Sequence, residues 1–417
     1  MPDDKTAPAT PRTSFAALRQ PGFRAFLATY FLAMMADNIE HVISYWMAYQ
    51  KFHSAALGGF AVVSHWLPFL VFSVPAGALA DRFDPRRLNQ IGMLLFMTAS
   101  LGWGYFFVTD TLQMWQAMVL LVIHGCAGVF WQTSSQILIH DIVTRDVLPS
   151  AVRLNATART LGVLVGPAVG GAIMLTLGPK YGIFLNACFY LPVILWMWKA
   201  PYGPKFRKGA PAPQRAVRGW ADIRQTLRDI ADRPLLLSMI LLAGAASFFI
   251  GNSYQAQMPN FAQDLGRGDP GVAYSALLAA DAAGALTAGF LLERWNLLKP
   301  SPRSAVLLAM GWCLSLGGFA MVHIYPLALF LLFCAGICEL SYNSMTQTIV
   351  QLNAPAEIRG RVIGVFNMCA MGMRTFSGIT VGLVGTIAGV HWSLGLSALV
   401  MLCVLLLLRR RLTVTHA

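Results

Sequence analysis

Charged residues are scarce in this chain. Of its 417 residues only 12% are Asp, Glu, Lys or Arg and 56% are hydrophobic, and the mean hydropathy is +0.58. In soluble proteins about a quarter of the residues are charged and about half are apolar. A chain of this length therefore has too little polar surface to cover soluble domains. The composition excludes a soluble globular protein and predicts that a lipid bilayer is its solvent.

Motifs for disulfides, metal binding and catalysis are lacking as well. The seven cysteines lie in apolar stretches and include no C-x-x-C pair, which predicts neither a disulfide framework nor a zinc site. The sequence contains no H-E-x-x-H, no G-x-S-x-G and no Walker-type phosphate loop. We therefore predict a protein that is not an enzyme, does not use ATP and requires neither a metal nor another cofactor.

Long apolar stretches dominate the rest of the sequence. Twelve of them can cross about 30 Å of hydrocarbon as helices of about 20 residues. They begin near Phe23, Ala56, Leu88, Leu112, Leu154, Tyr181, Pro234, Val272, Ser304, Tyr325, Val362 and Val390. The alternating pattern of a membrane β-barrel is absent, and backbone polar groups in lipid must be paired internally. We predict an all-α, polytopic membrane protein with twelve transmembrane helices.

Basic residues are distributed unequally between the two sides of such a protein. An even number of spans places both termini on one side, where 26 of the 31 Lys and Arg residues then fall. The opposite loops contain only Lys51, Lys180 and Arg267, while Arg159 and Arg374 lie within spans. Loops rich in Lys and Arg stay cytoplasmic. We expect a multi-pass protein of the bacterial inner membrane with both termini in the cytoplasm, no cleaved signal peptide, and no nucleic acid as a partner.

The chain divides into two halves. A basic, Pro-rich segment between the sixth and seventh spans predicts a flexible linker, and Trp220–Ala231 within it has the spacing of an interfacial helix. The expected divisions are residues 1–22 (N-terminal tail), 23–199 (first six-helix bundle), 200–233 (linker), 234–408 (second six-helix bundle) and 409–417 (C-terminal tail). Residues 77–83 (GALADRF) recur as residues 289–295 (GFLLERW) after the eighth span. This recurrence predicts a parallel repeat of two bundles.

Three motifs resemble those of a known family. Residues 77–87 (GALADRFDPRR) resemble the signature between the second and third helices of major facilitator superfamily transporters. Residues 162–171 (GVLVGPAVGG) match the G-x-x-x-G-P-x-x-G-G pattern typical of exporters in that superfamily. Residues 359–362 (RGRV) are similar to the branch that includes enterobactin-type siderophore exporters and macrolide efflux proteins. The resemblance covers essentially the whole chain and implies two parallel six-helix bundles that transport by alternating access.

The resemblance also implies roles for two groups of residues. The first is a conformational latch at the cytoplasmic ends of the helices: Gly77, Asp81, Arg82, Arg86, Arg87, Glu293 and Arg294. On physical grounds Gly77 allows two helices to approach closely, and Asp81 can accept hydrogen bonds from arginines or from a helix N-terminus. The alternative is that the basic residues only orient the protein. The second group is the exporter-type motif of Gly162, Gly166, Pro167, Gly170 and Gly171, which also suits plain helix packing.

Ionisable residues inside the predicted spans need a reason, because each charge at bilayer depth costs about 2.5–3.5 kcal/mol on insertion scales. Asp37, Glu40 and His41 stand at i, i+3 and i+4 on one helical face. Two carboxylates so close should not both ionise in a poorly hydrated site. We interpret them as a proton-coupling or cation-recognition cluster; the alternative is a set of helix contacts satisfied by polar neighbours and water. His65 and His124 are interpreted as satisfied helix contacts, with proton relays as the alternative.

Other polar residues are expected to complete the site. Asp281, Glu339 and Arg374 lie near mid-span, and Glu339 and Arg374 could form an ion pair, either functional or purely structural. The predicted substrate cavity is lined by Trp131, Gln132, Gln136, Asn252, Tyr254, Gln255, Tyr342, Asn343 and Gln347. The fourth span lacks the arginine that drug/proton antiporters of this superfamily usually carry. The Asp37 cluster would then have to supply proton coupling.

We predict a secondary active, proton-coupled exporter of an amphipathic small molecule such as a siderophore or drug. Its expected partners are that substrate, protons and membrane lipids, and we expect a monomer. One alternative is a lipid or lysophospholipid flippase, because the Asp37-Asn38 dipeptide is similar to one in lysophospholipid transporters. Lipid handling predicts lateral entry of the substrate and a dispensable proton gradient. A second alternative is a membrane sensor or scaffold that transports nothing.

Overall fold

The computed structural model describes residues 14–206, 220–265, 270–295, 297–377, 381 and 384–414. Within these ranges all regular secondary structure is helical, so the prediction of an all-α protein is confirmed. Most of the predicted N-terminal tail (1–13) and the Pro-rich part of the predicted linker (207–219) lie outside the described residues.

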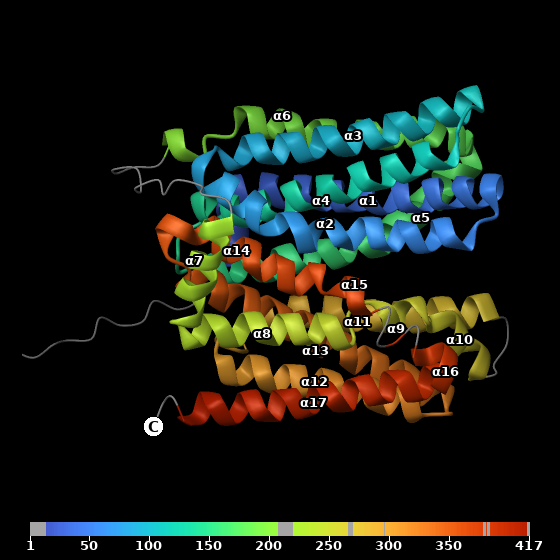
Figure 1. Ribbon diagram of the computed structural model, residues 1–417. Coiled ribbons are helices and arrows are strands. Elements are labelled where there is room, and N and C mark those ends of the chain that lie inside the picture. The colour runs from blue at the N-terminus through green and yellow to red at the C-terminus, as the bar shows by residue number, and fades with distance from the viewer. Residues whose placement is uncertain are drawn as a thin grey trace, which may run out of the picture.

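The first half of the chain forms long helices that run back and forth along one axis (Figure 1). They are the 3-10 helix η1 (Ala16–Arg19), α1 (Pro21–Phe52), α2 (Ala55–Arg82), α3 (Pro85–Thr109), α4 (Met114–Ile142), α5 (Leu148–Cys188) and α6 (Leu191–Lys199). Side chains cap two of them, because Ser54 accepts a hydrogen bond from the backbone N–H of Leu57 and Asp84 accepts one from that of Arg86. Gly178, at φ 75°, breaks α5 into two helical segments, a backbone conformation that suits glycine.

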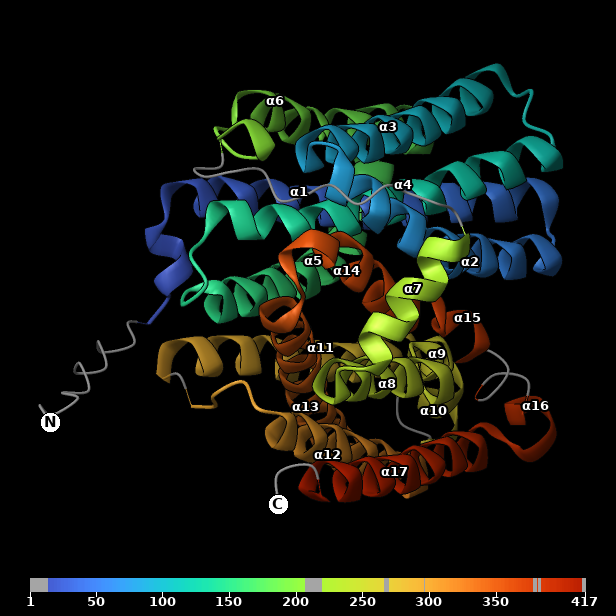
Figure 2. The same cartoon turned by 60° about the vertical axis from the view of Figure 1, so that its left-hand side comes forward.

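The second half repeats this arrangement with more interruptions. It contains η2 (Pro204–Phe206), α7 (Trp220–Ala231), α8 (Pro234–Phe249), α9 (Ser253–Ala256), α10 (Met258–Asp264), α11 (Pro270–Trp295), α12 (Pro302–Met321), α13 (Tyr325–Asn353), η3 (Ala356–Ile358), α14 (Arg359–Asn367), the π-helical turn η4 (Met368–Gly372), α15 (Arg374–Ser377), α16 (Val384–Ala388) and α17 (Val390–Val414). The chain bends by 111° between α7 and α8. Figure 2 shows α7 lying across one end of the bundle, where it contacts α8 and α14. We call this the linker end.

Within the described residues, each of the twelve predicted spans contains helix. Eight helices among the described residues are long and apolar enough to cross a membrane, or nine if the bent pair of α7 and α8 counts as one. One of these eight, Leu148–Phe206, contains both the fifth and the sixth predicted spans. The first and eleventh spans fail this measure for different reasons: α1 carries acids in its middle, and the eleventh is split into α14, η4 and α15.

The larger clusters of buried apolar residues lie mainly in one half or the other, and a small one joins Ala80, Leu88 and Ile137 to Ile363 across the interface. One core draws on α8 and α10–α14 together with α17, and two others draw on α1–α6. The halves meet where α2 packs on α14 and where α5 packs on α11 and α13. At the linker end α2 and α11 finish, and α5 and α14 begin, so this interface joins helix ends from opposite halves.

The same close helix crossing occurs in both halves. A Cβ atom on Gly125 of α4 would lie 2.0 Å from the carbonyl oxygen of Ser64 in α2. A Cβ atom on Gly336 of α13 would lie 2.0 Å from the carbonyl oxygen of Asp281 in α11. Only glycine allows backbones to approach this closely. These crossings fix the register of α4 on α2 and of α13 on α11, and both place ionisable residues side by side.

The N-terminal turn η1 contacts both halves at the linker end. The backbone N–H of Ala17 donates a hydrogen bond to Ser150 Oγ at the start of α5, at 3.1 Å. The ring of Phe15, just before η1, packs against that of Phe290 in α11, with ring centroids 6.0 Å apart. The chain therefore begins its described course by bridging α5 and α11.

Candidate functional site

The acids of α1 converge on one histidine from α4. His124 lies between Asp37 and Glu40, with Nε2 2.8 Å from Asp37 Oδ1 and Nδ1 2.8 Å from Glu40 Oε1. All three side chains are buried, His124 with 3% of its surface exposed. An imidazolium can donate from both ring nitrogens, so His124 can balance one of the two negative charges. The structure thus gives the paired carboxylates of α1 a partner that sequence spacing did not reveal.

Glu40 is held from a second side. The hydroxyl of Ser100 in α3 donates to Glu40 Oε2, and Asn186 Nδ2 in α5 donates to Ser100 Oγ at 3.3 Å. Both oxygens of the Glu40 carboxylate therefore have defined partners from neighbouring helices. Such a network fixes the position of a buried charge.

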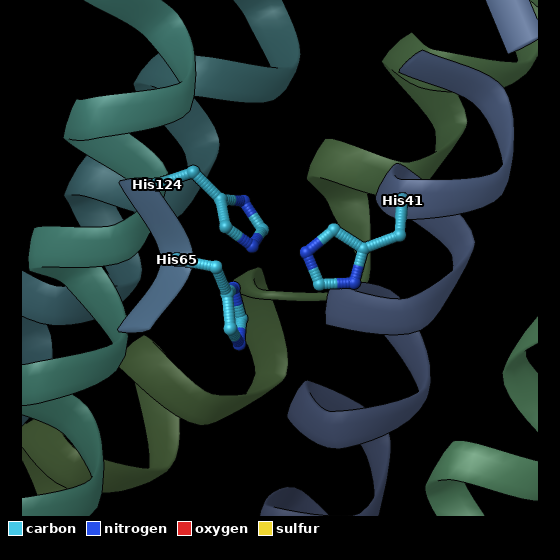
Figure 3. Close-up of side chains that lie close together, drawn as sticks. All are labelled: His41, His65 and His124. Carbon is cyan, nitrogen blue, oxygen red and sulfur yellow. The ribbon is translucent and has the colours of Figure 1, made fainter. Parts of the chain in front are cut away.

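Two more histidines complete the N-terminal cluster (Figure 3). The ring of His41 on α1 faces the rings of His65 on α2 and His124 on α4, with centroid separations of 4.9 and 4.7 Å. The rings of His65 and His124 are 5.8 Å apart. Gly125 and Ser64 form the close crossing of α4 and α2. His124 directly precedes Gly125, and His65 directly follows Ser64, so the crossing brings these two histidines together. The interpretation of His65 and His124 as separate helix contacts missed this convergence.

A second acidic cluster lies in the C-terminal half. Asp281 of α11 and Glu339 of α13 both contact the hydroxyl group of Tyr254 in α9, with 3.0 Å from Tyr254 Oη to each carboxyl oxygen. Gln255 Nε2 donates to Asp281 Oδ2 at 3.1 Å. Asp281 is 6% exposed, and its Oδ1 has no hydrogen-bond partner among the described residues. The close crossing at Gly336 brings these two acids together.

Arg374 does not join this cluster by an ion pair. Its guanidinium lies over the ring of Trp66 in α2, 4.9 Å from the ring centroid. In the part of the chain that the structure describes, no ion pair links it to Glu339, which instead contacts Tyr254. The expected Glu339–Arg374 pair is therefore not formed in this structure, because Arg374 stacks across the interface on the opposite half. Arg159, on α5, contacts Met371 Sδ at 3.8 Å.

Asp81 joins the two halves at the linker end. Its carboxylate accepts hydrogen bonds from the backbone N–H groups of Gly360 and Arg361, the latter at 3.1 Å, and Arg361 Nε lies 3.8 Å away. These groups are at the N-terminus of α14, where unpaired N–H groups and the helix dipole favour an anion. A Cβ on Gly77 would lie 2.0 Å from the carbonyl oxygen of Gly360. Because Gly77 allows α2 to approach α14 closely, the Asp81 carboxylate lies at the N-terminus of α14.

Three of the four arginines of the predicted latch, Arg82, Arg86 and Arg87, contact groups other than Asp81. Arg86 pairs with Asp84 at 2.6 Å and donates to the carbonyl oxygen of Ala200. The remaining contacts are a stack of Arg82 over the ring of Phe83, 5.5 Å from its centroid, and a 2.9 Å hydrogen bond from Arg87 to Gln90. The basic partner of Asp81 is Arg361, which the sequence placed in another motif.

Glu293, the counterpart of Asp81 in the repeat, also bridges the halves. Ser150 Oγ at the start of α5 donates to its carboxylate, and Arg153 Nε and Nη2 both lie 2.9 Å from Glu293 Oε2. Glu293 is 1% exposed. The neighbouring Arg294 contacts Ser14 through its carbonyl oxygen and its guanidinium. Each half therefore sends one acid from the end of a helix to the start of a helix in the other half.

The exporter-type glycines pack α5 against α1. Cβ atoms on Gly162 and Gly166 would lie 2.7 Å from Met34 Cγ and 2.5 Å from Asn38 Cβ, and Gly170 lies against Ile39. Gly171 has nothing within 4 Å of such an atom. The motif thus sets the distance of α5 from the segment of α1 that carries Asp37. Pro167 lies inside α5.

The predicted cavity residues are dispersed among several contacts. Gln136 bridges the halves by donating to Asn367 Oδ1 at 2.9 Å, while Trp131 packs on Tyr30 at 4.9 Å between centroids. Tyr342 is buried against Trp312, at 5.3 Å between ring centroids. The half-buried members of the set are Gln132, Asn252, Gln255, Asn343 and Gln347.

A pocket of about 450 Å³ opens at the linker end. It lies between the end of α4 and the loop after α13, and its lining includes His140, Arg145, Gln351 and Arg359. None of the predicted cavity residues lines this pocket. The structure therefore gathers them into helix contacts and buried clusters rather than around this opening.

Comparison with known proteins identifies the fold and the family. Residues 26–378 match the family model of the Major Facilitator Superfamily. The multidrug efflux pump Tap of Mycobacterium tuberculosis is 25% identical over 401 residues, which cover 92% of each chain. The enterobactin exporter EntS of Citrobacter koseri is 22% identical over 356 residues, covering 83% of this chain and 81% of the exporter.

Solved structures agree in fold. The fucose transporter FucP in its outward conformation superposes with a TM-score of 0.71 at 14% identity, covering 93% of this chain and 98% of the other. The human organic anion transporter TETRAN gives a TM-score of 0.70 at 15% identity, with 93% and 100% covered. The chain belongs to the Major Facilitator Superfamily. It is a multi-pass membrane transporter and not an enzyme.

Proposed function

We propose that this protein is a proton-coupled secondary transporter that exports an amphipathic small molecule by alternating access. The observation that carries proton coupling is the shared hydroxyl of Tyr254, 3.0 Å from both Asp281 and Glu339. A hydroxyl group has a single proton to donate, so it can satisfy only one ionised carboxylate. The second carboxyl group can hydrogen-bond to the same oxygen only by donating a proton of its own. The pair therefore holds one exchangeable proton in this geometry.

The two acidic clusters differ in their counter-charge. Asp37 and Glu40 have His124 between them, whereas no ion pair reaches Asp281 or Glu339 in the described part of the chain. A buried pair of acids without a cation avoids two negative charges by keeping a proton. We therefore place the transported proton at Asp281 and Glu339, which belonged to the same predicted set as Asp37.

Alternating access is supported by the two contacts at the linker end. Asp81 binds the N-terminus of α14, and Glu293 binds Ser150 and Arg153 at the start of α5. The distribution of basic residues supports a cytoplasmic position for this end, where these contacts would close the cytoplasmic side. Breaking both pairs lets the halves separate there and admits substrate from the cytoplasm.

Export of an amphipathic molecule is supported by the relatives and by the α5 motif. The named activities of those relatives are multidrug efflux and enterobactin export. Three of the four α5 glycines that match the exporter pattern, Gly162, Gly166 and Gly170, pack directly on α1. We propose a monomer in the bacterial inner membrane, exposed to lipid on its outer face, with both termini in the cytoplasm.

Transport in everted membrane vesicles tests the proposal. A panel of siderophores, cationic drugs and lysophospholipids is offered with and without a protonophore. Accumulation of a siderophore or drug that the protonophore stops supports proton-coupled export, and transport of none of the panel contradicts it. Asp281→Asn should lower gradient-driven transport at least about tenfold, equivalent to 1.4 kcal/mol in rate, while leaving ligand binding within about tenfold. Glu357→Gln, which neutralises an exposed acid, is the matched control.

The same assay separates the lipid-flippase alternative. A flippase would move lysophospholipid after the proton gradient is collapsed. Asn38, part of the dipeptide that suggested this alternative, donates to the carbonyl oxygen of Met34 in its own helix at 2.8 Å. Its amide therefore satisfies a local backbone group and gives the flippase no additional support.

A further inference from the structure

In each of the three histidines of the N-terminal half, one buried ring nitrogen makes no aligned hydrogen bond. His41 Nε2, His65 Nδ1 and His124 Nε2 are buried and have no aligned hydrogen-bond partner among the described residues. One ligand nitrogen from each ring lies within 4.8 Å of the other two. Burial of an unpaired polar atom costs about 1–3 kcal/mol, so three such atoms on adjacent rings require an explanation.

We propose that His41, His65 and His124 form a binding site for one divalent transition-metal ion of the Zn²⁺, Co²⁺ and Ni²⁺ class. Imidazole nitrogen is a preferred ligand for these ions. Two nitrogens bound at 2.0–2.1 Å to one tetrahedral Zn²⁺ are about 3.3–3.4 Å apart. Small rotations of the rings bring atoms separated by 4.8 Å or less into that range. Metal binding then gives one nitrogen of each ring a partner.

The acids of α1 supply the negative charge that a buried metal ion needs. Asp37 Oδ1 lies 2.8 Å from His124 Nε2, in a contact that is not an aligned hydrogen bond, so a carboxylate oxygen stands beside a ligand nitrogen. This makes Asp37 the fourth ligand of a tetrahedral site with three nitrogens and one oxygen. Its charge and that of Glu40 offset the two positive charges of the ion, which lowers the cost of burying it.

Glu40 supplies the orientation that a metal-binding histidine needs. Its Oε1 lies 2.8 Å from His124 Nδ1, so Nδ1–H can donate to it while Nε2 stays available to the ion. A carboxylate that receives the second N–H of a ligand histidine fixes both the tautomer and the ring orientation. Ser100 in turn holds Glu40 from α3. The arrangement is therefore supported by a helix that contributes no ligand.

The sequence hides this site because its ligands come from three helices. His41, His65 and His124 have no short spacing between them, and the cysteines that usually indicate zinc are in other places. The close crossing of Gly125 on Ser64 sets the register that brings His65 and His124 together. The site lies wholly in α1, α2 and α4, so an ion there would tie three helices of one half without crossing to the other.

Cobalt absorption spectroscopy tests the proposal at equilibrium, independently of transport. The full chain is purified in detergent with a tag that contains no histidine, freed of metal by chelation and titrated with Co²⁺. We expect one Co²⁺ per chain with the intense visible bands of tetrahedral coordination, displaced by Zn²⁺. Glu40→Gln should weaken binding about 10–100-fold while keeping these bands, as expected for loss of a supporting carboxylate.

Substitution of two ligand histidines, with a histidine outside the site as the control, tests which residues bind Co²⁺. His41→Gln and His65→Gln keep the side-chain volume, and each should lower Co²⁺ affinity at least about tenfold and abolish the tetrahedral bands. His323→Gln, an exposed histidine in the other half, should change neither. Thermal unfolding in detergent verifies that each variant is folded. Absence of stoichiometric Co²⁺ binding, or binding that survives both ligand substitutions, overturns the proposal, and neither result depends on whether a substrate is exported.

Discussion

Asp281 and Glu339 come from different helices yet reach the same oxygen atom, Tyr254 Oη, at 3.0 Å each. This geometry underlies the proposal that the two carboxyl groups hold one proton between them. It also makes the proton sensitive to movement of α9, α11 and α13 relative to one another, because Tyr254 is the only link between the acids that the described residues provide. If Tyr254 moves away from the two acids, the shared hydrogen bond is lost and no longer holds the proton.

Tyr254→Phe isolates this contribution. Removing the hydroxyl leaves two buried carboxyl groups without their common partner, and each buried polar group left unpaired costs about 1–3 kcal/mol. We expect a lower unfolding temperature in detergent and slower proton-driven transport. Tyr274→Phe is the control, because Tyr274 is half-buried in α11 and makes no hydrogen bond in the described part of the chain. Equal losses in the two variants would show that the shared hydroxyl has no special role.

Gly77→Ala should shift the conformational equilibrium. Its Cβ would lie 2.0 Å from the carbonyl oxygen of Gly360, so α2 and α14 must separate at the linker end. Such overpacking typically costs about 1–3 kcal/mol and penalises only the closed arrangement. A cysteine introduced at the linker end should therefore react faster with a labelling reagent. Gly171→Ala, where a Cβ meets nothing within 4 Å, should leave labelling unchanged.

Asp81→Asn should slow the transport cycle without altering which compounds compete. The amide keeps one oxygen acceptor but presents an NH₂ group to one of the two backbone donors of α14, so a charge-assisted hydrogen bond is lost. Transport rates and competition profiles in vesicles measure the two effects separately. A changed order of competitors would place Asp81 in substrate recognition instead of the latch.

The pair of Glu293 and Arg153 can be examined by a double-mutant cycle. Breaking a buried ion pair by removing one partner costs about 3–5 kcal/mol because the other charge is left uncompensated. Arg153→Gln and Glu293→Gln should each lower the unfolding temperature, and the double variant should be less destabilised than the sum of the two. Strict additivity would mean that the ion pair contributes no coupling energy. Asp110→Asn is a suitable surface control, since its pair with Lys51 is exposed.

The fold followed from the sequence to a large extent because lipid imposes simple rules. Long apolar runs must be helices, and the recurrence of Gly77 and Asp81 as Gly289 and Glu293 marked the repeat. The eleventh span is interrupted by the π-helical turn η4, where a Cβ on Gly372 would lie 2.5 Å from Leu70 Cα. That interruption depends on packing against α2, which apolarity alone does not encode.

The site could be predicted only where its members share one helix. Asp37, Glu40 and His41 were found by their spacing, and Asp81 by its motif. The partners His124, Arg361 and Arg153 were not assigned to these acids, because each comes from a distant segment brought close by helix register. The two glycines at the close crossings, Gly125 and Gly336, are the local signal that could have helped, since each lies within three residues of an ionisable residue in its own helix.

The bridge made by Phe15 and Ala17 has a practical consequence for anyone handling this transporter. Ala17 contacts α5 and Phe15 contacts α11. When the halves separate, at least one of these two contacts must break. A bulky fusion attached directly ahead of Ser14, in place of residues 1–13, would obstruct these contacts and shift the equilibrium between the closed and open arrangements of the linker end.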